Sequence, residues 1–259
     1  MKIIPLGTRG FYPSFGRHTM SFLLYDERSM FILDAGTGLA RLKEEKLAAL
    51  VAKYEMVHIL LSHYHLDHIT GLPYLAGVLP HTKFNLYVPS PPFSDVDGPG
   101  VIHTFLNPPF FSLSMTDFPG FSQLIEITQA RLEIEGHLLE FMRLKHGGGS
   151  VGIKIDRTIS YITDTVPDPR VVEFIRGSQL VLHEVWMTGD EAAAKPGTPK
   201  IHCSYPEVLD MMHQAAVKKL VPVHLNPAWD EAAIRNIFHE RVMTGLEVIL
   251  PMEAEIIDF

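Results

Sequence analysis

Short apolar runs bounded by polar turn residues follow one another along the first third of the chain. They have the length of strands and are rich in isoleucine, leucine, valine and phenylalanine, which favours buried β-strands. The runs that predict strands are 2–6, 21–25, 30–34, 56–61 and 84–88. Residues 39–54 differ, because their leucines and valine recur at helical spacing with lysine and glutamate between them. This stretch predicts an amphipathic surface helix.

The second half of the chain continues with strands and helices. The predicted strands are 124–129, 131–135, 139–145, 151–155, 158–163, 180–186, 219–224, 247–250 and 254–259. Helices are predicted at 205–216 and 230–241, and the first has Ser204 as its N-cap with Glu207 three residues on, as in a capping box. A chain of 259 residues with this mixture allows one large domain or two small ones.

Residues 89–123 differ in composition from the rest, because they hold seven prolines and six phenylalanines. A flexible linker would be rich in glycine and serine instead. We therefore predict an ordered, packed insertion without long regular elements. Such a loop can form a wall or lid beside a site, or serve packing or a dimer contact, and the sequence leaves these alternatives open.

The densest group of metal-binding side chains follows the apolar run 56–61. His63, His65, Asp67 and His68 lie within six residues, where a predicted strand ends. In an extended segment His63 and His65 share a face, so both can reach one metal ion. Asp67 and His68 lie past the bend and can point at a second ion. Imidazole and carboxylate without thiolate suit zinc, manganese or iron.

This His-x-His-x-Asp-His arrangement resembles the signature of the metallo-β-lactamase superfamily. The resemblance implies an α/β fold built as a four-layer αββα sandwich. It covers nearly the whole chain, so we expect a single domain over 1–259 in which 89–123 is an insertion. It also implies a hydrolase with two divalent metal ions, for which zinc is the first expectation and manganese or iron the alternatives.

The resemblance assigns further ligands to three later positions. His146 ends a predicted strand and precedes three glycines, which leave room for a close approach to a metal. It matches the histidine that completes the first metal's set. Asp164 matches the aspartate that bridges both metals, and His224 matches the last ligand of the second metal. Asp34 matches an aspartate that supports the site from outside the ligand shell.

Further motifs resemble the ribonuclease Z-like phosphodiesterase branch of the superfamily. His183 and Glu184 match the start of its His-Glu-Ala-Thr motif, with Val185 and Trp186 as departures. The stretch beginning at His202 resembles its His-Ser-Thr motif, and the last predicted histidine ligand begins a stretch similar to its terminal His-x-Ser-Pro. The branch resemblance therefore implies a phosphodiesterase.

The resemblance implies hydrolysis by a hydroxide that bridges the two metals, with Asp67 in the catalytic set. His202 has no place among the ligands, so we expect it to protonate the leaving alkoxide as a general acid, oriented by Glu184. The neighbouring Cys203 is not expected to be a ligand. The alternatives are a lactone or thioester hydrolase, a metal-bearing interaction protein on a retired scaffold, and a tRNA 3′-processing endonuclease.

Composition limits the partners. The net charge is −8 and no long basic arm is present, which argues against a grip on long nucleic acid and favours a small-molecule or nucleotide phosphodiester. Arg9, Arg17 and His18 fall in a predicted loop, where they could face a substrate or only solvent.

Location and assembly are predicted from equally simple features. The single cysteine excludes an intrachain disulfide and fits a reducing compartment. No apolar stretch reaches the ~20 residues of a membrane span, and the first residues do not read as a secretory signal. We therefore expect a cytoplasmic protein without a membrane partner. The family resemblance adds a homodimer as an expectation.

Overall fold

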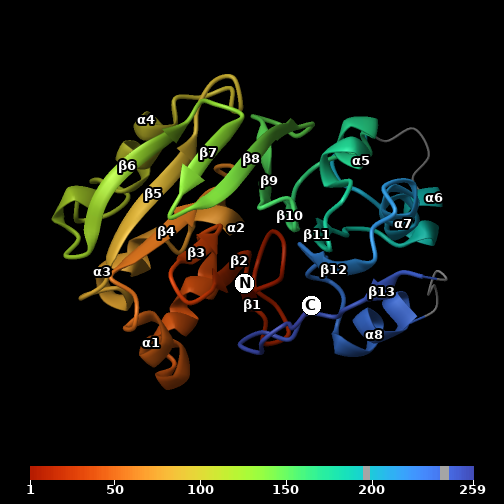
Figure 1. Cartoon of the computed structure of the whole chain (residues 1–259), viewed down its shortest axis with the longest axis horizontal. Coiled ribbons are helices and arrows are strands. Elements are labelled where there is room, and N and C mark those ends of the chain that lie inside the picture. Colours follow the sequence, from red (N-terminus) through yellow and green to blue (C-terminus); the bar gives the residue numbers. More distant parts are fainter. Residues whose placement is uncertain (195–198, 240–244) are drawn as a thin grey trace. The chain divides into compact units, whose positions relative to one another are not determined.

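The computed structural model describes residues 1–194, 199–239 and 245–259. The chain divides into two compact units, each built around one β-sheet (Figure 1). The first unit comprises Met1–Thr8, Arg17–Thr128 and Met252–Asp258, and the second comprises Arg9–Gly16, Gln129–Pro251 and Phe259. Both units are therefore assembled from segments that are distant in the sequence.

The sheet of the first unit has six strands in the order β1-β2-β3-β4-β5-β6. Their bounds are β1 Lys2–Gly7, β2 Ser21–Tyr25, β3 Met30–Leu33, β4 Met56–Leu60, β5 Lys83–Pro89 and β6 Phe121–Ile127. The first three strands pair antiparallel, and β3 to β6 pair parallel. Because Leu33 pairs with Leu60 in the parallel β3–β4 ladder, Asp34 and His63 leave the sheet at the same edge.

Helical segments of the first unit pack on the core of this sheet. They are η1 Thr37–Lys43, α1 Glu45–Val51, α2 Leu66–Ile69, η2 Leu72–Tyr74, α3 Leu75–Val78, α4 Gly98–Phe105 and η3 Met115–Asp117. The single helix predicted over 39–54 is wrong in its extent, because Glu44 is extended and separates η1 from α1. Arg41 explains the break, since its guanidinium donates to the carbonyl of Leu6 and to the carboxylate of Glu253. These bonds fix the 3-10 segment against β1.

The proline- and phenylalanine-rich stretch contains α4, η3 and the start of β6. Ile102, Leu106, Met115 and Phe118 are buried in the core of the first unit. The stretch is thus ordered and packed, as its composition predicts. A role of this stretch as a lid, a wall or a dimer contact stays a prediction.

The sheet of the second unit has seven strands in the order β13-β12-β11-β10-β9-β8-β7. Their bounds are β7 Arg131–Ile134, β8 His137–Leu144, β9 Ser150–Ile155, β10 Ile159–Ile162, β11 Leu180–Glu184, β12 Lys219–Val223 and β13 Glu247–Val248. Strands β7 to β10 pair antiparallel and β10 to β13 parallel. The carboxyl ends of β10, β11 and β12 therefore bring Asp164, Glu184 and His224 to one edge of the sheet.

The helices of the second unit are α5 Pro169–Ile175, α6 Gly189–Ala193, α7 Tyr205–Gln214 and α8 Glu231–His239. Helices α5 and α7 lie side by side (Figure 1). The predicted capping box of α7 is confirmed, because Ser204 and Glu207 exchange both of its hydrogen bonds. Helix α5 was not predicted; its N-cap is Asp168, whose carboxylate accepts from the backbone of Arg170.

The chain's last segment differs from the prediction. Residues 254–259 form no strand; only an isolated bridge joins Ile257 to Ile3. The last two residues of the predicted helix 230–241 lie outside the described residues. None of the helices in the described part of the chain has the length and apolar character that a membrane crossing requires.

Candidate metal and catalytic site

The first unit carries four of the predicted ligands, of which His63 and His65 lie between β4 and α2, and Asp67 and His68 lie in α2. The ring centroids of His63 and His65 are 4.7 Å apart, and those of His63 and His68 are 4.1 Å apart. A carboxylate oxygen of Asp67 lies 3.4 Å from Nε2 of His68. The bend between β4 and α2 thus gathers three imidazoles and a carboxylate, as the sequence spacing predicts.

Asp34 supports this cluster from beneath. Its fully buried carboxylate accepts from the backbone N–H of Ser62 at 2.6 Å, from the Ser62 hydroxyl at 2.8 Å and from Nδ1 of His68 at 2.7 Å. A carboxylate on Nδ1 fixes the ring orientation and leaves Nε2 as the ligand atom. Asp34 has a left-handed backbone with φ 59, a strained conformation of the kind that clusters at functional sites.

The second unit gathers its predicted ligands around Asp164. One carboxylate oxygen lies 3.5 Å from Nε2 of His146, and the other lies 3.2 Å from Nε2 of His224. Asp164 and His224 are buried, so a carboxylate sits between two imidazoles at the edge of the sheet. Such an arrangement suits a shared divalent cation, because burial of a charge is costly without a partner or a metal.

His202 and Glu184 form a hydrogen-bonded pair in the same unit. Nδ1 of His202 lies 2.8 Å from the Glu184 carboxylate, whose other oxygen accepts from the backbone of Thr165 at 2.6 Å. Burial raises the pKa of Glu184, and the nearby His202 opposes that rise. The pairing has the geometry of a histidine that is held by a carboxylate.

His202 also lies close to two predicted ligands. Ligand atoms of His202, Asp164 and His224 all lie within 4.8 Å of one another. The geometry of the second unit therefore permits His202 either to deliver a proton or to bind a metal. The buried Cys203 beside it points elsewhere, because its thiol donates to the carbonyl of Thr165.

Trp186 belongs to the site although the sequence analysis treated it only as a motif departure. Its indole stacks on the His202 ring at a centroid distance of 4.8 Å and packs on the His224 ring at 5.3 Å. The sequence signal that could have found it is its position two residues beyond Glu184, at the end of a strand that leads into the site.

Gly10 is a second residue that the sequence analysis left without a role. A Cβ at this position would lie 2.4 Å from Cε1 of His224 and 2.6 Å from both ring nitrogens. The backbone N–H of Gly10 donates to the carbonyl of Leu225. The absence of a side chain at position 10 therefore leaves the space that the His224 ring occupies.

The arginines of the predicted loop are structural. Arg9 is fully buried and donates to the carbonyls of Asn226 and Trp229 at 3.0 and 2.6 Å. Arg17 is buried and donates to the Thr8 hydroxyl. Arg9 thereby holds the Arg9–Gly16 segment on the turn that follows His224, within the second unit. A role for either guanidinium in binding substrate finds no support in these contacts.

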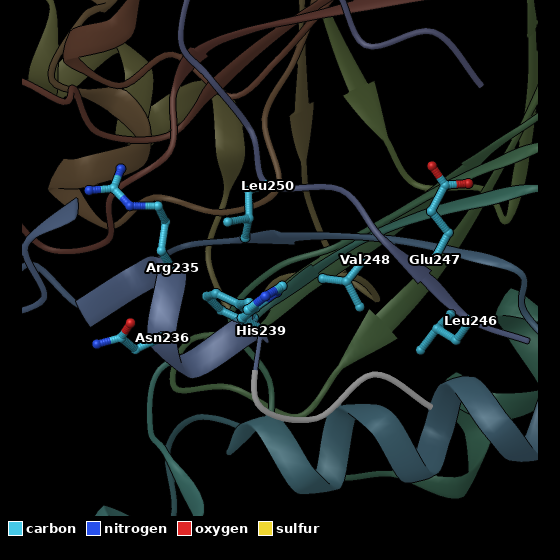
Figure 2. A pocket seen from close by; sticks show the side chains of 8 residues that line it. Arg235, Asn236, His239, Leu246, Glu247, Val248 and Leu250 are labelled. Carbon is cyan, nitrogen blue, oxygen red and sulfur yellow. The ribbon is translucent and has the colours of Figure 1, made fainter. Parts of the chain in front are cut away.

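One hollow of the second unit is lined by α8 and the residues around β13. In the second unit, α8 and the β13 segment enclose about 690 Å³ (Figure 2). Figure 2 shows the guanidinium of Arg235 and the carboxylate of Glu247 on opposite sides of this hollow. Among the described residues that line it, none is a predicted ligand.

An apolar hollow lies beside the first cluster. It measures about 730 Å³ within the first unit and is lined by α4 together with Leu66 and Ile69. Leu66 is 65% exposed and stands between the predicted ligands His65 and Asp67. Residues of α4 and two residues of α2 therefore line the same apolar hollow.

Comparisons with known proteins agree with the sequence resemblance. The profile of the family described as Anti-Pycsar protein Apyc1 matches residues 1–246. Ribonuclease Z from Treponema denticola is 22% identical over an alignment that covers 96% of this chain and 97% of that protein. The chain thus resembles ribonuclease Z over nearly its whole length.

Solved structures show the same fold. The metallo-β-lactamase fold protein YhfI from Bacillus subtilis superposes with a TM-score of 0.74 at 20% identity, covering 98% of each chain. The short form of human tRNase Z superposes with a TM-score of 0.73 at 18% identity, covering 100% of this chain and 99% of that chain. The predicted metallo-β-lactamase fold is confirmed. The curated relatives and these structures agree with the prediction of a metal-dependent hydrolase.

Proposed function

The chain belongs to the family of the Anti-Pycsar protein Apyc1, and we propose that it hydrolyses a small phosphodiester, such as a nucleotide, with two divalent metal ions. The observation that carries this proposal is the buried His202–Glu184 pair beside Asp164 and His224. Hydrolysis of a phosphodiester expels an alkoxide, which needs a proton. A thioester hydrolase depends less on such a donor, because a thiolate leaves more readily than an alkoxide.

The donor atoms fit divalent ions. Imidazole and carboxylate without thiolate suit zinc first, with manganese or iron as alternatives. The proposed ligands of the first ion are His63, His65 and His146, those of the second are Asp67, His68 and His224, and Asp164 is shared. Bound ions would neutralise phosphate charge and lower the pKa of water to ~7.

His202 would hold the proton that the leaving oxygen receives. Its Nδ1 is engaged with Glu184 at 2.8 Å, so Nε2 is the atom that would donate. Glu184 is fully buried and would keep the ring in this tautomer and orientation. Asp67 completes the proposed catalytic set, because its carboxylate can accept a proton from the attacking water.

A small substrate is favoured over tRNA by charge. The net charge is −8, and neutralising many phosphates requires clustered lysine and arginine. The likeness to ribonuclease Z keeps tRNA 3′-processing as the second candidate. The two candidates differ in whether a precursor tRNA or a small diester is cleaved faster at physiological salt.

We also propose a cytoplasmic location and a homodimer. Cell fractionation would test the location, and sedimentation would test the dimer.

The test is hydrolysis of a linear dinucleotide, whose leaving group is an unactivated alkoxide, by metal-loaded protein, with bound metal measured for every variant. His202→Ala should keep both metals and lose ~10²–10⁴-fold in kcat, the usual contribution of a general acid. His213→Ala is the matched control, because His213 is exposed on α7. Loss of a metal from His202→Ala would make His202 a ligand. No hydrolysis with two metals bound would redirect the search to lactones and thioesters.

A further inference from the structure

Trp186 lies half-buried at the point where β11 ends. Its indole stacks on the ring of His202 with a centroid distance of 4.8 Å and an interplanar angle of 28°. His224 and His146 follow at 5.2 Å with 31° and 5.5 Å with 40°. Aromatic rings at such separations attract each other in offset-stacked arrangements. The indole therefore covers one face of His202.

The backbone of Trp186 is tied to both histidine-bearing segments. Its N–H donates to the carbonyl of Cys203 at 3.0 Å, and its carbonyl accepts from the side-chain amide of Asn226 at 3.1 Å. Cys203 directly follows His202, and Asn226 lies two residues beyond His224. These two hydrogen bonds hold the backbone of Trp186 against the segments that carry His202 and His224. The indole therefore has a defined position relative to both rings.

Glu184 alone does not fix the direction in which His202 points. Its carboxylate holds one atom of the ring, Nδ1, at 2.8 Å. This hydrogen bond and the covalent Cβ–Cγ bond hold one edge of the ring, and rocking of the ring plane about that edge would still move Nε2 relative to a substrate. A flat neighbour against the ring face removes this freedom. The indole of Trp186 supplies that face, and the small side chains of the resembled His-Glu-Ala-Thr motif would not.

We propose that Trp186 is a positioning residue, which holds the His202 ring so that Nε2 faces the leaving oxygen. The inference rests on the proposed function, because it assigns His202 the role of proton donor. It adds that this chain uses a ring stack together with the Glu184 hydrogen bond to aim the donor. Catalytic misplacement of about 1 Å can cost ~10²-fold in rate, so the effect on turnover should be large.

The experiment compares Trp186→Leu and Trp186→Phe with wild type in metal-loaded protein, using a linear dinucleotide whose leaving group is an unactivated alkoxide. Trp186→Leu should lower kcat by ~10–100-fold with little change in KM or metal content. Trp186→Phe keeps an aromatic face and should recover most of that loss. Phe174→Ala is the control, because Phe174 is a half-buried aromatic of the same unit that packs on its core. It should leave kcat unchanged.

A spectroscopic readout tests the stack without reference to activity. The ring-proton NMR signals of His202, assigned through His202→Gln, should carry a ring-current shift from the indole. This shift should vanish in Trp186→Leu and persist in part in Trp186→Phe. A purely structural role for Trp186 would lower thermal stability without this joint pattern of kcat, KM and ring-proton shift.

The outcomes separate the two proposals. Wild-type kcat in metal-loaded Trp186→Leu, with His202→Ala inactive, overturns the positioning role and leaves the proposed function standing. Loss of metal from Trp186→Leu also overturns it, because the indole would then act on His224. Full activity of His202→Ala defeats the proposed function itself. If Trp186→Leu does not fold, Trp186→Phe decides: a reduced kcat at full metal content supports the role, and a wild-type kcat overturns it.

Discussion

The contact between Gly10 and His224 allows a sharp test of the second unit's part of the site. Gly10 does not have a left-handed backbone, so alanine fits its conformation and Gly10→Ala adds only a methyl group. That methyl carbon would lie 2.4 Å from Cε1 of His224, whereas an ordinary contact starts at 3.4 Å. The ring must therefore withdraw by about 1 Å, the difference of these two distances.

The ring has to move because the backbone is held. Gly10 donates to the carbonyl of Leu225, and the neighbouring Arg9 is buried with hydrogen bonds to Asn226 and Trp229. Metal–ligand distances tolerate only ~0.2 Å. A displacement five times larger should lower the affinity for the ion at His224 by at least ~100-fold, the upper end of effects from residues that orient ligands. Overpacking should also lower the free energy of unfolding by ~1–3 kcal/mol.

The assay is metal content after equilibrium dialysis against a chelator of known affinity, followed by kcat for bis(p-nitrophenyl) phosphate. Gly77→Ala is the matched control, because a Cβ there meets no atom within 4 Å and its φ is not left-handed. We expect Gly10→Ala to retain one ion of two and to lose turnover. Two tightly bound ions with wild-type kcat in Gly10→Ala would refute the assignment of His224 as a ligand that needs this space.

Three further changes test the supporting network. Asp34→Asn should weaken metal binding by ~10–100-fold, because the buried carboxylate orients His68; competition with a chromogenic chelator measures this, and unchanged affinity would contradict it. Glu253→Gln should lower the free energy of unfolding by ~1–3 kcal/mol, because the Glu253 carboxylate accepts two hydrogen bonds from Arg41. Urea titration measures this change, and Glu255→Gln at an exposed position is the control. Burial lowers the pKa of His183 to about 4, so the unfolded chain binds the proton more readily and stability should fall as pH drops from 6.5 towards 4, by up to ~3 kcal/mol. His183→Leu should flatten this dependence in urea titrations at each pH, and an equally steep loss in the variant would assign the effect to other groups.

The part of the site that the sequence predicts is the part that is local. His63 and His65 are two residues apart on an extended segment, so their shared face follows from backbone geometry alone. Asp164 and His224 were assigned through the resemblance to the metallo-β-lactamase superfamily. Their convergence needed the strand order β10-β11-β12, which no spacing in the sequence contains.

Contacts between distant residues account for what the sequence did not predict. The break between η1 and α1 depends on Arg41 meeting Glu253, 212 residues away, whereas the local pattern of 39–54 favours one helix. Trp186 looked like a motif departure because its partner His202 comes later in the chain. Gly10 could not be recognised either. A glycine in a loop indicates only a turn, and the contact with the His224 ring is known only from the structure.

Glu253 has a further consequence for the order in which the protein is made. Its carboxylate accepts from Thr8, His18 and Arg41, which precede it by 212 to 245 residues. A growing chain therefore presents these donors to water throughout synthesis of the entire second sheet. The first unit can close its polar network only after Met252–Asp258 has left the ribosome. The first unit is thus completed only after all strands of the second sheet have been synthesised.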